Sequence, residues 1–310
     1  MKGYIGVTDN DWFSFLSKQP EIDEVNFWQP GGKSLFRSLS LGEPFFFKLH
    51  SPLNFIAGGG FFAHSTILPV SLAWQTFEIK NGAKSYLQIR RMIEKFRRTS
   101  SRFEDYKIGC IILTQPFFFP KDQWIPIPPD FSLNIVQGKT YDLTQGHGSR
   151  IWSQVKERLS TLPFSGSIEK NKAEDITRRF GTPTLVEQRL GQGSFRVIVT
   201  DAYQRKCAIT HEKILPALEA AHIQPFSENG PNRVDNGLLL RSDIHRLFDA
   251  GYVTVTKDYH FEVSKRVKEE FDNGKQYRQF HGNRINLPNR FESQPGPDFL
   301  SWHNENVFRG

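Results

Sequence analysis

Short apolar runs separated by turn residues fill the first 145 positions of the chain. Residues 4–7 (YIGV), 44–49 (PFFFKL), 54–62 (NFIAGGGFF) and 108–113 (IGCIIL) are of this kind, and Gly-Gly, Ser-Pro and Pro-Pro pairs punctuate the sequence around them. Short apolar runs bounded by glycine and proline are typical of β-strands. We therefore predict a mostly β segment over residues 1–145.

Two helical patterns belong to this first segment. Residues 85–103 (SYLQIRRMIEKFRRTSSRF) place Leu87, Ile89, Ile93 and Phe96 on an approximate apolar stripe. Residues 150–160 (RIWSQVKERLS) predict a helix that closes the segment.

The first of these helices carries Arg90 and Arg91 on its charged side. A charged helix face is either a solvated surface or a surface that faces phosphate groups. Both interpretations stay open for Arg90 and Arg91.

The pattern predicts two domains, 1–160 and 195–310. Residues 161–194 between them are polar and punctuated by glycine, as in a linker. The second domain begins with a helical pattern over 195–210 (FRVIVTDAYQRKCAIT) that leads into a turn. Residues 252–271 (YVTVTKDYHFEVSKRVKEEF) predict a hairpin followed by a short helix.

The centre of the second domain predicts a strand, a loop, a second strand and a helix. His222 lies in the apolar run AAHIQPF, and the loop SENGPNRVDNG follows it. In LLLRSDIHRLFDAG, Ser242 is expected to cap the helix and Gly251 to end it. Its inward face is expected to consist of Ile244, Leu247 and Phe248.

Three polar groups of this stretch suggest hydrolytic chemistry. His245 and Asp249 are four residues apart, so their side chains share one helix face and can bind one divalent cation. A neutral histidine such as His222 can take a proton from water near neutral pH, and Asn236 could hold the site in register. Singly, each has an ordinary structural explanation: a core histidine, an Asn-Gly turn, a carboxylate at a helix end. Their combination is more specific.

The overall composition and charge of the chain narrow the class of partner and the cellular setting that we expect. The chain has 310 residues, a formal net charge of +7 and a sequence pI near 9.3, which favours a polyanionic partner such as nucleic acid. No segment approaches the roughly 18 uninterrupted apolar residues of a membrane span, and no secretory signal is expected at the N-terminus. Two cysteines cannot build a disulfide framework, so we expect a cytoplasmic protein.

The run from Ala220 to Gly251 resembles an HNH nuclease, the ββα-metal fold, and the resemblance covers about residues 195–310. It implies that His222 is the general base, that Asn236 orients the loop and that His245 contacts the metal. Many members have Asp directly before the first His, where this chain has Ala221. The replacement ligand is expected to be Asp249, ahead of Asp243 and Glu219.

Zinc-bearing members of this family carry four cysteines around the same core. The matching positions here are Cys207, Thr210, Arg241 and Ile244, so a four-cysteine zinc site cannot form and no structural zinc is expected. Packing must hold the scaffold instead, through Leu238, Leu240, Ile244 and Phe248. The catalytic metal is expected to be Mg, Mn, Co or Ni, among which oxygen and imidazole ligands do not choose.

The longer run that begins at residue 189 resembles the HNH modules of predicted bacterial restriction endonucleases. That resemblance implies contacts to the DNA backbone by Arg189, Gln192 and Arg196. Plain surface charge is the equally weighted alternative for Arg196.

The first domain resembles the EVE branch of the PUA-like fold. The matching pieces are Trp28, Gly42-Glu43, FFFKLHS and FIAGGG, with Glu43 where Asp is usual and Lys48 within the strand. The resemblance implies an α+β chain whose first domain is a β-barrel with helices. It also implies an aromatic pocket that holds a flipped, modified base. The candidate pocket walls are Trp12, Trp28, Trp74, Phe47 and Trp124. The candidate contacts to the base edge are Asn26, His50 and Ser51.

An EVE-like domain joined to an HNH nuclease resembles the modification-dependent restriction endonucleases. The expected partner is double-stranded DNA carrying 5-methyl- or 5-hydroxymethylcytosine, with no membrane involved. Two-strand cleavage by one active site usually needs two copies, which makes a homodimer an expectation too. The alternatives are a nuclease specific for sequence, structure or phosphorothioate DNA, and a metal-free binding protein, which Ala221 would permit. A protein-interaction role for residues 1–145 is a further alternative.

Overall fold

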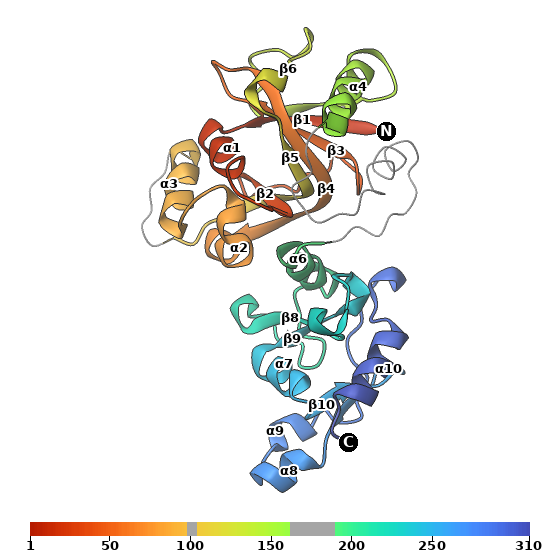
Figure 1. Cartoon of the computed structure of the whole chain (residues 1–310). Helices are drawn as coiled ribbons and strands as arrows, with labels where there is room; N and C mark the ends of the chain where they lie inside the picture. Colours follow the sequence, from red (N-terminus) through yellow and green to blue (C-terminus); the bar gives the residue numbers. More distant parts are fainter. Residues whose placement is uncertain (98–103, 162–189) are drawn as a thin grey trace. The chain divides into compact units, whose positions relative to one another are not determined.

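The structure, a computed structural model, describes residues 1–97, 104–161 and 190–310. The chain divides into two compact units, Met1–Gln188 and Arg189–Gly310, which the colours of Figure 1 follow along the sequence. None of the described helices is long and apolar enough to cross a membrane. Most of the segment predicted as a linker lies outside the described residues, and its last residues already belong to helix α6 (Gln192–Ala202).

Unit 1 is built on one seven-stranded sheet with the order β2-β5-β4-β3-β1-β7, in which β6 also pairs with β4. Strands β1 and β3 are parallel, and the other pairs are antiparallel. The strands are β1 (Lys2–Thr8), β2 (Glu24–Gln29), β3 (Pro44–Leu49), β4 (Phe55–Pro69), β5 (Lys107–Phe118), β6 (Ile125–Pro126) and β7 (Gly138–Asp142).

The predicted α+β class is confirmed, and the predicted closure into a barrel is not. Strands β2 and β7 end the ladder, and no pairing between them is found within the described residues. The strands are also longer than predicted. The apolar run at 108–113 falls within β5, which continues to Phe118 through Gln115 in a left-handed backbone conformation (φ 49°).

The glycine run of β4 lets this strand lie close to both of its neighbours. A Cβ at Gly59 would lie 2.5 Å from the carbonyl oxygen of Phe45 in β3, and a Cβ at Gly58 would collide with the carbonyl oxygen of Phe117 in β5. The register shifts between Gly59 and Phe61 at the same place. Gly58 and Gly59 are therefore a packing requirement.

Within the described residues, four α-helices accompany this sheet, and Figure 1 shows α1, α2 and α3 on one side of the strands and α4 on the other. They are α1 (Asn10–Leu16), α2 (Val70–Phe77), α3 (Tyr86–Arg97) and α4 (Gly146–Thr161). The predicted stripe of α3 is only half right. Ile89 and Ile93 are buried, whereas Leu87 and Phe96 are 64% and 45% exposed, because their positions turn them away from the sheet.

Alternate side chains of β3 enter two different apolar clusters. Phe46 packs into a core that includes Trp152 of α4, with the two rings 6.1 Å apart. Phe45 and Phe47 point to the opposite side, where their rings lie 4.7 and 6.3 Å from the ring of Phe27. This period-2 alternation explains why the whole run PFFFKL is buried.

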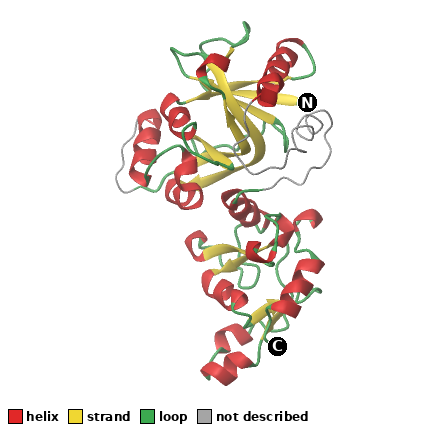
Figure 2. Ribbon diagram, in the orientation of Figure 1, coloured by secondary structure: helices red, strands yellow, loops and turns green. Residues whose placement is uncertain are grey.

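Unit 2 contains the predicted strand, loop, strand and helix: β8 (Leu218–His222), β9 (Gly237–Arg241) and α7 (Ser242–Asp249). The predicted hairpin and short helix are also confirmed. They are β10 (Val253–Val255), β11 (Phe261–Val263) and α8 (Arg266–Phe271), after which the chain continues through α9 (Lys275–Arg278) and α10 (Pro297–Asn306). Figure 2 shows these short strands in yellow among the helices.

The ends of α7 were predicted with one error. Gly251 adopts the left-handed conformation expected after a helix (φ 75°). Ser242, in contrast, is the first helical residue. Strand β9 runs directly into α7, so Arg241 occupies the cap position and makes no side-chain capping bond.

The thiol of Cys207 lies in a closed turn. Its Sγ accepts hydrogen bonds from the backbone N–H groups of Ile209 (3.4 Å), Thr210 (3.5 Å) and Arg241 (3.3 Å). The side chains expected to hold the scaffold by packing are all buried: Leu238, Leu240, Ile244 and Phe248.

His303 makes the stability of unit 2 sensitive to acid. Its Nε2–H donates to the carbonyl oxygen of Phe248 (3.1 Å), its Nδ1 accepts from the Thr254 hydroxyl (2.8 Å), and it is 2% exposed. Burial lowers the pKa of His303 from 6.5 to about 4. Between these values the unfolded chain binds the extra proton. The free energy of unfolding should therefore fall by about 3 kcal/mol as the pH drops from 6.5 to 4.

This fall is measured by urea unfolding across that pH range, comparing the wild type with His303→Gln. The difference between the two proteins should shrink as the pH falls. A difference independent of pH would contradict the assignment.

Candidate active site

His222 ends strand β8 and faces the first helix of unit 2. It pairs with Gly237 of β9, and its imidazole stacks on the ring of Phe195 in α6, with centroids 3.9 Å apart and planes within 10°. Gly237 is needed there, because a Cβ would lie 2.6 Å from a methyl group of Val199. The stack leaves the imidazole little rotational freedom.

A second contact fixes His222 from the loop. Its Nε2 lies 2.8 Å from the Oδ1 of Asn232, and the Nδ2 of Asn232 donates to the carbonyl oxygen of Leu190 (2.8 Å). The sequence pattern does not single out Asn232. Asn229, Asn232 and Asn236 all occur in this loop, and no local pattern separates them.

The surroundings keep His222 neutral. Burial lowers its pKa, and the nearby imidazole of His245 acts in the same direction. The hydrogen bond with Asn232 and the charge of Asp249 oppose this shift only in part. A neutral imidazole near physiological pH is what a general base requires.

Asn236 holds the loop that separates His222 from β9. Its Oδ1 accepts from the backbone N–H of Gln224 (2.9 Å), and its Nδ2 donates to the carbonyl oxygens of Gln224 (2.9 Å) and Pro231 (3.0 Å). The side chain is fully buried. These contacts match a loop-orienting role and place the amide away from direct contact with a substrate.

His245 stands on α7 with a carboxylate at each ring nitrogen. Its Nδ1 lies 2.7 Å from the Oε2 of Glu219 in β8, and its Nε2 lies 3.4 Å from the Oδ2 of Asp249. Because a metal-binding histidine usually donates its other N–H to a carboxylate, Glu219 suits that supporting role. Nε2 and Asp249 then form the pair that can face a cation.

The pKa of Asp249 responds to burial and to three neighbouring groups. Burial raises the pKa of its carboxyl, and the charge of Glu219 adds to the rise. The imidazoles of His245 and His222 lower it. Asp243, a weaker candidate ligand, is engaged elsewhere: Arg241 binds both of its oxygens (2.6 and 2.7 Å), and Tyr277 donates to one of them.

The donor set fits a divalent cation with two protein ligands. An imidazole nitrogen and a carboxylate suit Mg, Mn, Co or Ni, and such ions commonly complete their shell with waters and phosphate oxygens. Within the described ranges, no three His, Cys, Asp or Glu residues are grouped to hold a metal ion. Glu219 contacts the ring nitrogen of His245 that Asp249 does not, which leaves His245 and Asp249 as the candidate pair of ligands.

Removing the Glu219 carboxylate should weaken metal binding. We expect Glu219→Ala to lower Mn²⁺ affinity roughly 10- to 100-fold, because His245 loses the acceptor that orients its ring. Titration calorimetry of the full chain measures this, with Glu228→Ala, an exposed residue of the same unit, as the matched control. Wild-type affinity in Glu219→Ala would show that the contact does not support a metal ligand.

Two of the three residues of unit 2 that were predicted to contact the DNA backbone lie within the described residues. Gln192 is exposed and Arg196 half-buried, four residues apart on α6, the helix that carries Phe195. Arg189 lies outside the described residues.

Two of the predicted base contacts in unit 1 belong to a buried network. Asn26 is fully buried and its Nδ2 donates to the Oδ1 of Asn81 (2.9 Å), while the Nε1 of Trp28 donates to the carbonyl oxygen of Asn81 (3.1 Å). Trp74 is half-buried, and His50 and Ser51 are exposed after β3.

Of the other candidate pocket walls, Trp12 and Phe47 are buried and Trp124 is half-buried. Burial of this degree makes Trp12 and Phe47 part of the aromatic core of unit 1.

The arginines of α3 are used in different ways. Arg90 pairs with Glu94 (3.0 Å) and lies over the rings of Tyr86 and Tyr106. Arg91 is exposed.

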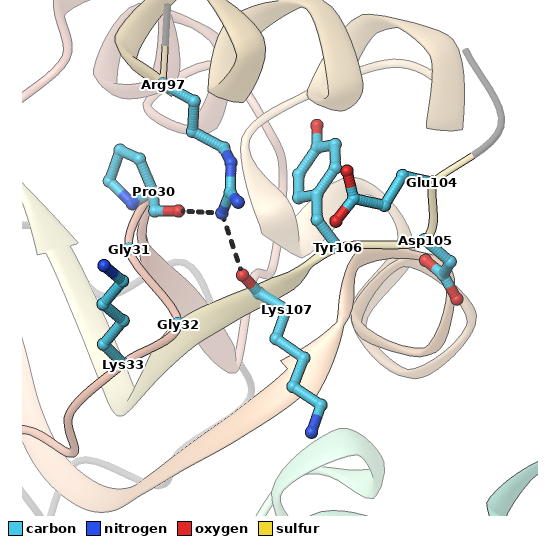
Figure 3. Close-up of a pocket in the computed structure, with 9 residues that line it drawn as sticks. All are labelled: Pro30, Gly31, Gly32, Lys33, Arg97, Glu104, Asp105, Tyr106 and Lys107. Atoms are coloured by element: carbon cyan, nitrogen blue, oxygen red, sulfur yellow. Dashed lines mark hydrogen bonds between the residues drawn. The ribbon is translucent and has the colours of Figure 1, made fainter. Parts of the chain in front are cut away.

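A shallow surface pocket lies at the end of α3 (Figure 3), where Arg97 donates to the carbonyl oxygens of Pro30 (2.7 Å) and Lys107 (3.1 Å). Arg97 therefore serves the fold.

The comparisons with known proteins agree with the geometry of unit 2. A family model described as HNH endonuclease matches residues 207–256, which include His222, Asn236, His245 and Asp249. No curated protein matches. A solved structure titled "Modification dependent TagI restriction endonuclease" aligns over 97% of this chain and 81% of its own, at 12% identity and a TM-score of 0.29. That overlap is too weak to carry an argument. The chain thus contains an HNH endonuclease domain, and the predicted enzyme class, a metal-dependent nuclease, is confirmed.

Proposed function

We propose that this chain is a divalent-metal-dependent endonuclease that cuts double-stranded DNA containing modified cytosine. One observation carries the nuclease chemistry: strand β8, which ends in His222, contacts the His245–Asp249 pair of α7 through Glu219, whose Oε2 lies 2.7 Å from His245 Nδ1. A base and a metal-binding pair on one ββα unit are what phosphodiester hydrolysis needs.

The chain's own residues divide the reaction between them. His222 takes a proton from a water molecule, whose oxygen forms a bond to phosphorus as the bond to the leaving oxygen breaks. His245 and Asp249 would hold the cation, which supplies positive charge against the charge that grows on the phosphate. Glu219 orients His245 through Nδ1, and Phe195 and Asn232 orient His222.

DNA is the proposed substrate because of charge and exposure. The net charge of +7 favours a polyanion. Gln192 and Arg196 are four residues apart on α6 and therefore share one helix face, and the same helix carries Phe195, which stacks on His222. They are the proposed contacts to the DNA backbone. Arg189, Arg90 and Arg91 remain proposed contacts of the same kind.

Two polar side-chain atoms lie in the interior of unit 1. Within the described residues, the Oδ1 of Asn26 and the Nε1 of Trp12 are buried without a hydrogen-bond partner. Both adjoin one turn: Asn26 binds Asn81, and the indole of Trp12 packs against Gly82. Trp12 and Asn26 belong to the buried interior of unit 1, so the proposed base-reading site relies on its exposed and half-buried candidates, His50, Ser51 and Trp74.

The exposed candidates His50 and Ser51 connect to the same region. The backbone N–H of His50 donates to Oδ1 of Asn10 (2.9 Å) in α1, the helix that carries Trp12. Trp28 contributes through Asn81, and Trp74 of α2 is the remaining proposed wall.

The test is cleavage of one plasmid prepared unmodified, cytosine-methylated and hydroxymethylated, each with Mg²⁺, Mn²⁺ and Ni²⁺. We expect cutting confined to a modified plasmid. Equal cutting of all three would keep the nuclease and remove the modified-base reader. Binding to the modified plasmid without cutting under any metal would favour a binding protein instead.

A further inference from the structure

We infer that Asn232 is a positioning residue that fixes the tautomer of His222 and makes Nδ1 the basic nitrogen. Its consequence for cutting rests on the proposed function. Neither the family match nor the resemblance of the sequence assigns Asn232 a role, and the Asn of the HNH pattern is Asn236.

The orientation of the Asn232 amide follows from its second contact. The carbonyl oxygen of Leu190 can only accept a hydrogen bond, so the group 2.8 Å from it is the NH₂ of Asn232. The amide oxygen must then be the atom that faces Nε2 of His222, also at 2.8 Å. Leu190 thus removes the ambiguity between the two ends of the amide.

The amide oxygen in turn selects the protonated ring nitrogen. Because Oδ1 is an acceptor, a hydrogen bond to it requires a hydrogen on Nε2. A neutral imidazole carries one N–H, so the lone pair lies on Nδ1. The opposite tautomer would set two lone pairs against each other at hydrogen-bond distance.

Nothing in the described part of the chain competes for this lone pair. No hydrogen bond to His222 Nδ1 is formed by the described residues, and the stack on Phe195 holds the ring face. Nδ1 is therefore the nitrogen left to accept a proton from water.

A neutral partner suits this position. His245 and Asp249 already act on the pKa of His222, in opposite directions. Asn232 orients the ring without adding a third charge. An aspartate there would also accept from Nε2, but its negative charge would favour the imidazolium and keep the base protonated to higher pH.

Asn232 and Asn236 therefore have different roles in this loop. Asn236 bonds only to backbone groups of Gln224 and Pro231 and holds the loop closed. Asn232 bonds to the His222 side chain and to the backbone at Leu190, at the start of unit 2.

The test measures the tautomer directly, by ¹H–¹⁵N correlation spectra of the full chain labelled with ¹⁵N-histidine, at about pH 8 where imidazoles are neutral. His222→Gln identifies the His222 signals by their loss. We expect the wild type to show a protonated Nε2 and an unprotonated Nδ1. We expect Asn232→Ala to show a mixture, with kcat lowered roughly 10- to 100-fold and the melting temperature unchanged.

Two further variants separate orientation from folding. Asn232→Asp should regain much of the lost kcat at high pH, with the acidic limb of its pH–rate profile moved upward by about one unit. Asn229→Gly lies in the same exposed loop and keeps its left-handed backbone, so it should match the wild type in spectrum and rate.

Each outcome decides the matter. A wild-type spectrum with the proton on Nδ1 overturns the inference even if DNA is cut efficiently. So does an Asn232→Ala protein with the wild-type spectrum and rate, or an Asn232→Asp profile that is not shifted. If the chain cuts no DNA, the proposed function fails, while the tautomer of His222 is still measured by the same spectra.

Discussion

Replacing His222 with alanine is expected to lower the rate of DNA cleavage by roughly 10²- to 10⁴-fold and to leave DNA binding unchanged. The imidazole is the neutral base of the site, and burial keeps its pKa below the ordinary value. Within the described residues, no other group both stacks on Phe195 and contacts Asn232, as His222 does. Water would then attack without a positioned base.

The measurement is plasmid cleavage under single turnover at saturating enzyme, beside binding of the same DNA by a mobility shift. His260→Ala is the matched control, because His260 is an exposed histidine of the same unit outside the site. A fall in binding equal to the fall in rate would contradict a role for His222 as base. Retained cleavage would exclude it.

Replacing His245 with alanine is expected to abolish measurable Mn²⁺ binding at this site and to lower cleavage by roughly 10²- to 10³-fold. Asp249→Ala should behave similarly, since Nε2 of His245 and Oδ2 of Asp249 face one another at 3.4 Å and would share one cation. The double variant should cleave DNA no more slowly than the slower of the two single variants, because both changes remove the same cation.

Calorimetric titration with Mn²⁺ and cleavage rates test this pair together. Asp258→Asn, an exposed carboxylate on the turn between β10 and β11, serves as the control. Additive losses in the double variant would show that His245 and Asp249 act separately. Normal Mn²⁺ binding in His245→Ala would place the metal elsewhere.

The ββα core was predictable because its signals are local. The apolar strand around His222, the glycine after α7 and the four-residue spacing of His245 and Asp249 are all set by short-range geometry. That spacing alone places the two side chains together, as the structure confirms.

The groups that orient the site were not predictable in the same way. Asn232 acts through Leu190, which is 42 residues away along the chain and contributes only a backbone carbonyl. Glu219 meets His245 because β8 packs beside α7, and it was expected only as a weak metal ligand. Contacts set by tertiary packing leave no periodic trace in the sequence.

Contacts set by tertiary packing were not predictable in unit 1 either. The apolar runs correctly marked β1, β3, β4 and β5, but the parallel pairing of β1 with β3 joins segments about forty residues apart. Asn26 and Trp28 read as polar and aromatic candidates for a base contact, and the structure turns both toward Asn81. The surroundings of both side chains are therefore set by a turn that is distant in the sequence.

The most direct test of the account is the metal dependence of plasmid cleavage by the full chain. The protein would be stripped with a chelator, and conversion of a supercoiled, cytosine-modified plasmid would be followed before and after Mn²⁺ is added. The account predicts no conversion by the stripped enzyme, recovery on adding Mn²⁺, and no recovery in His245→Ala. Undiminished cleavage in excess chelator, or full recovery in His245→Ala, would contradict it.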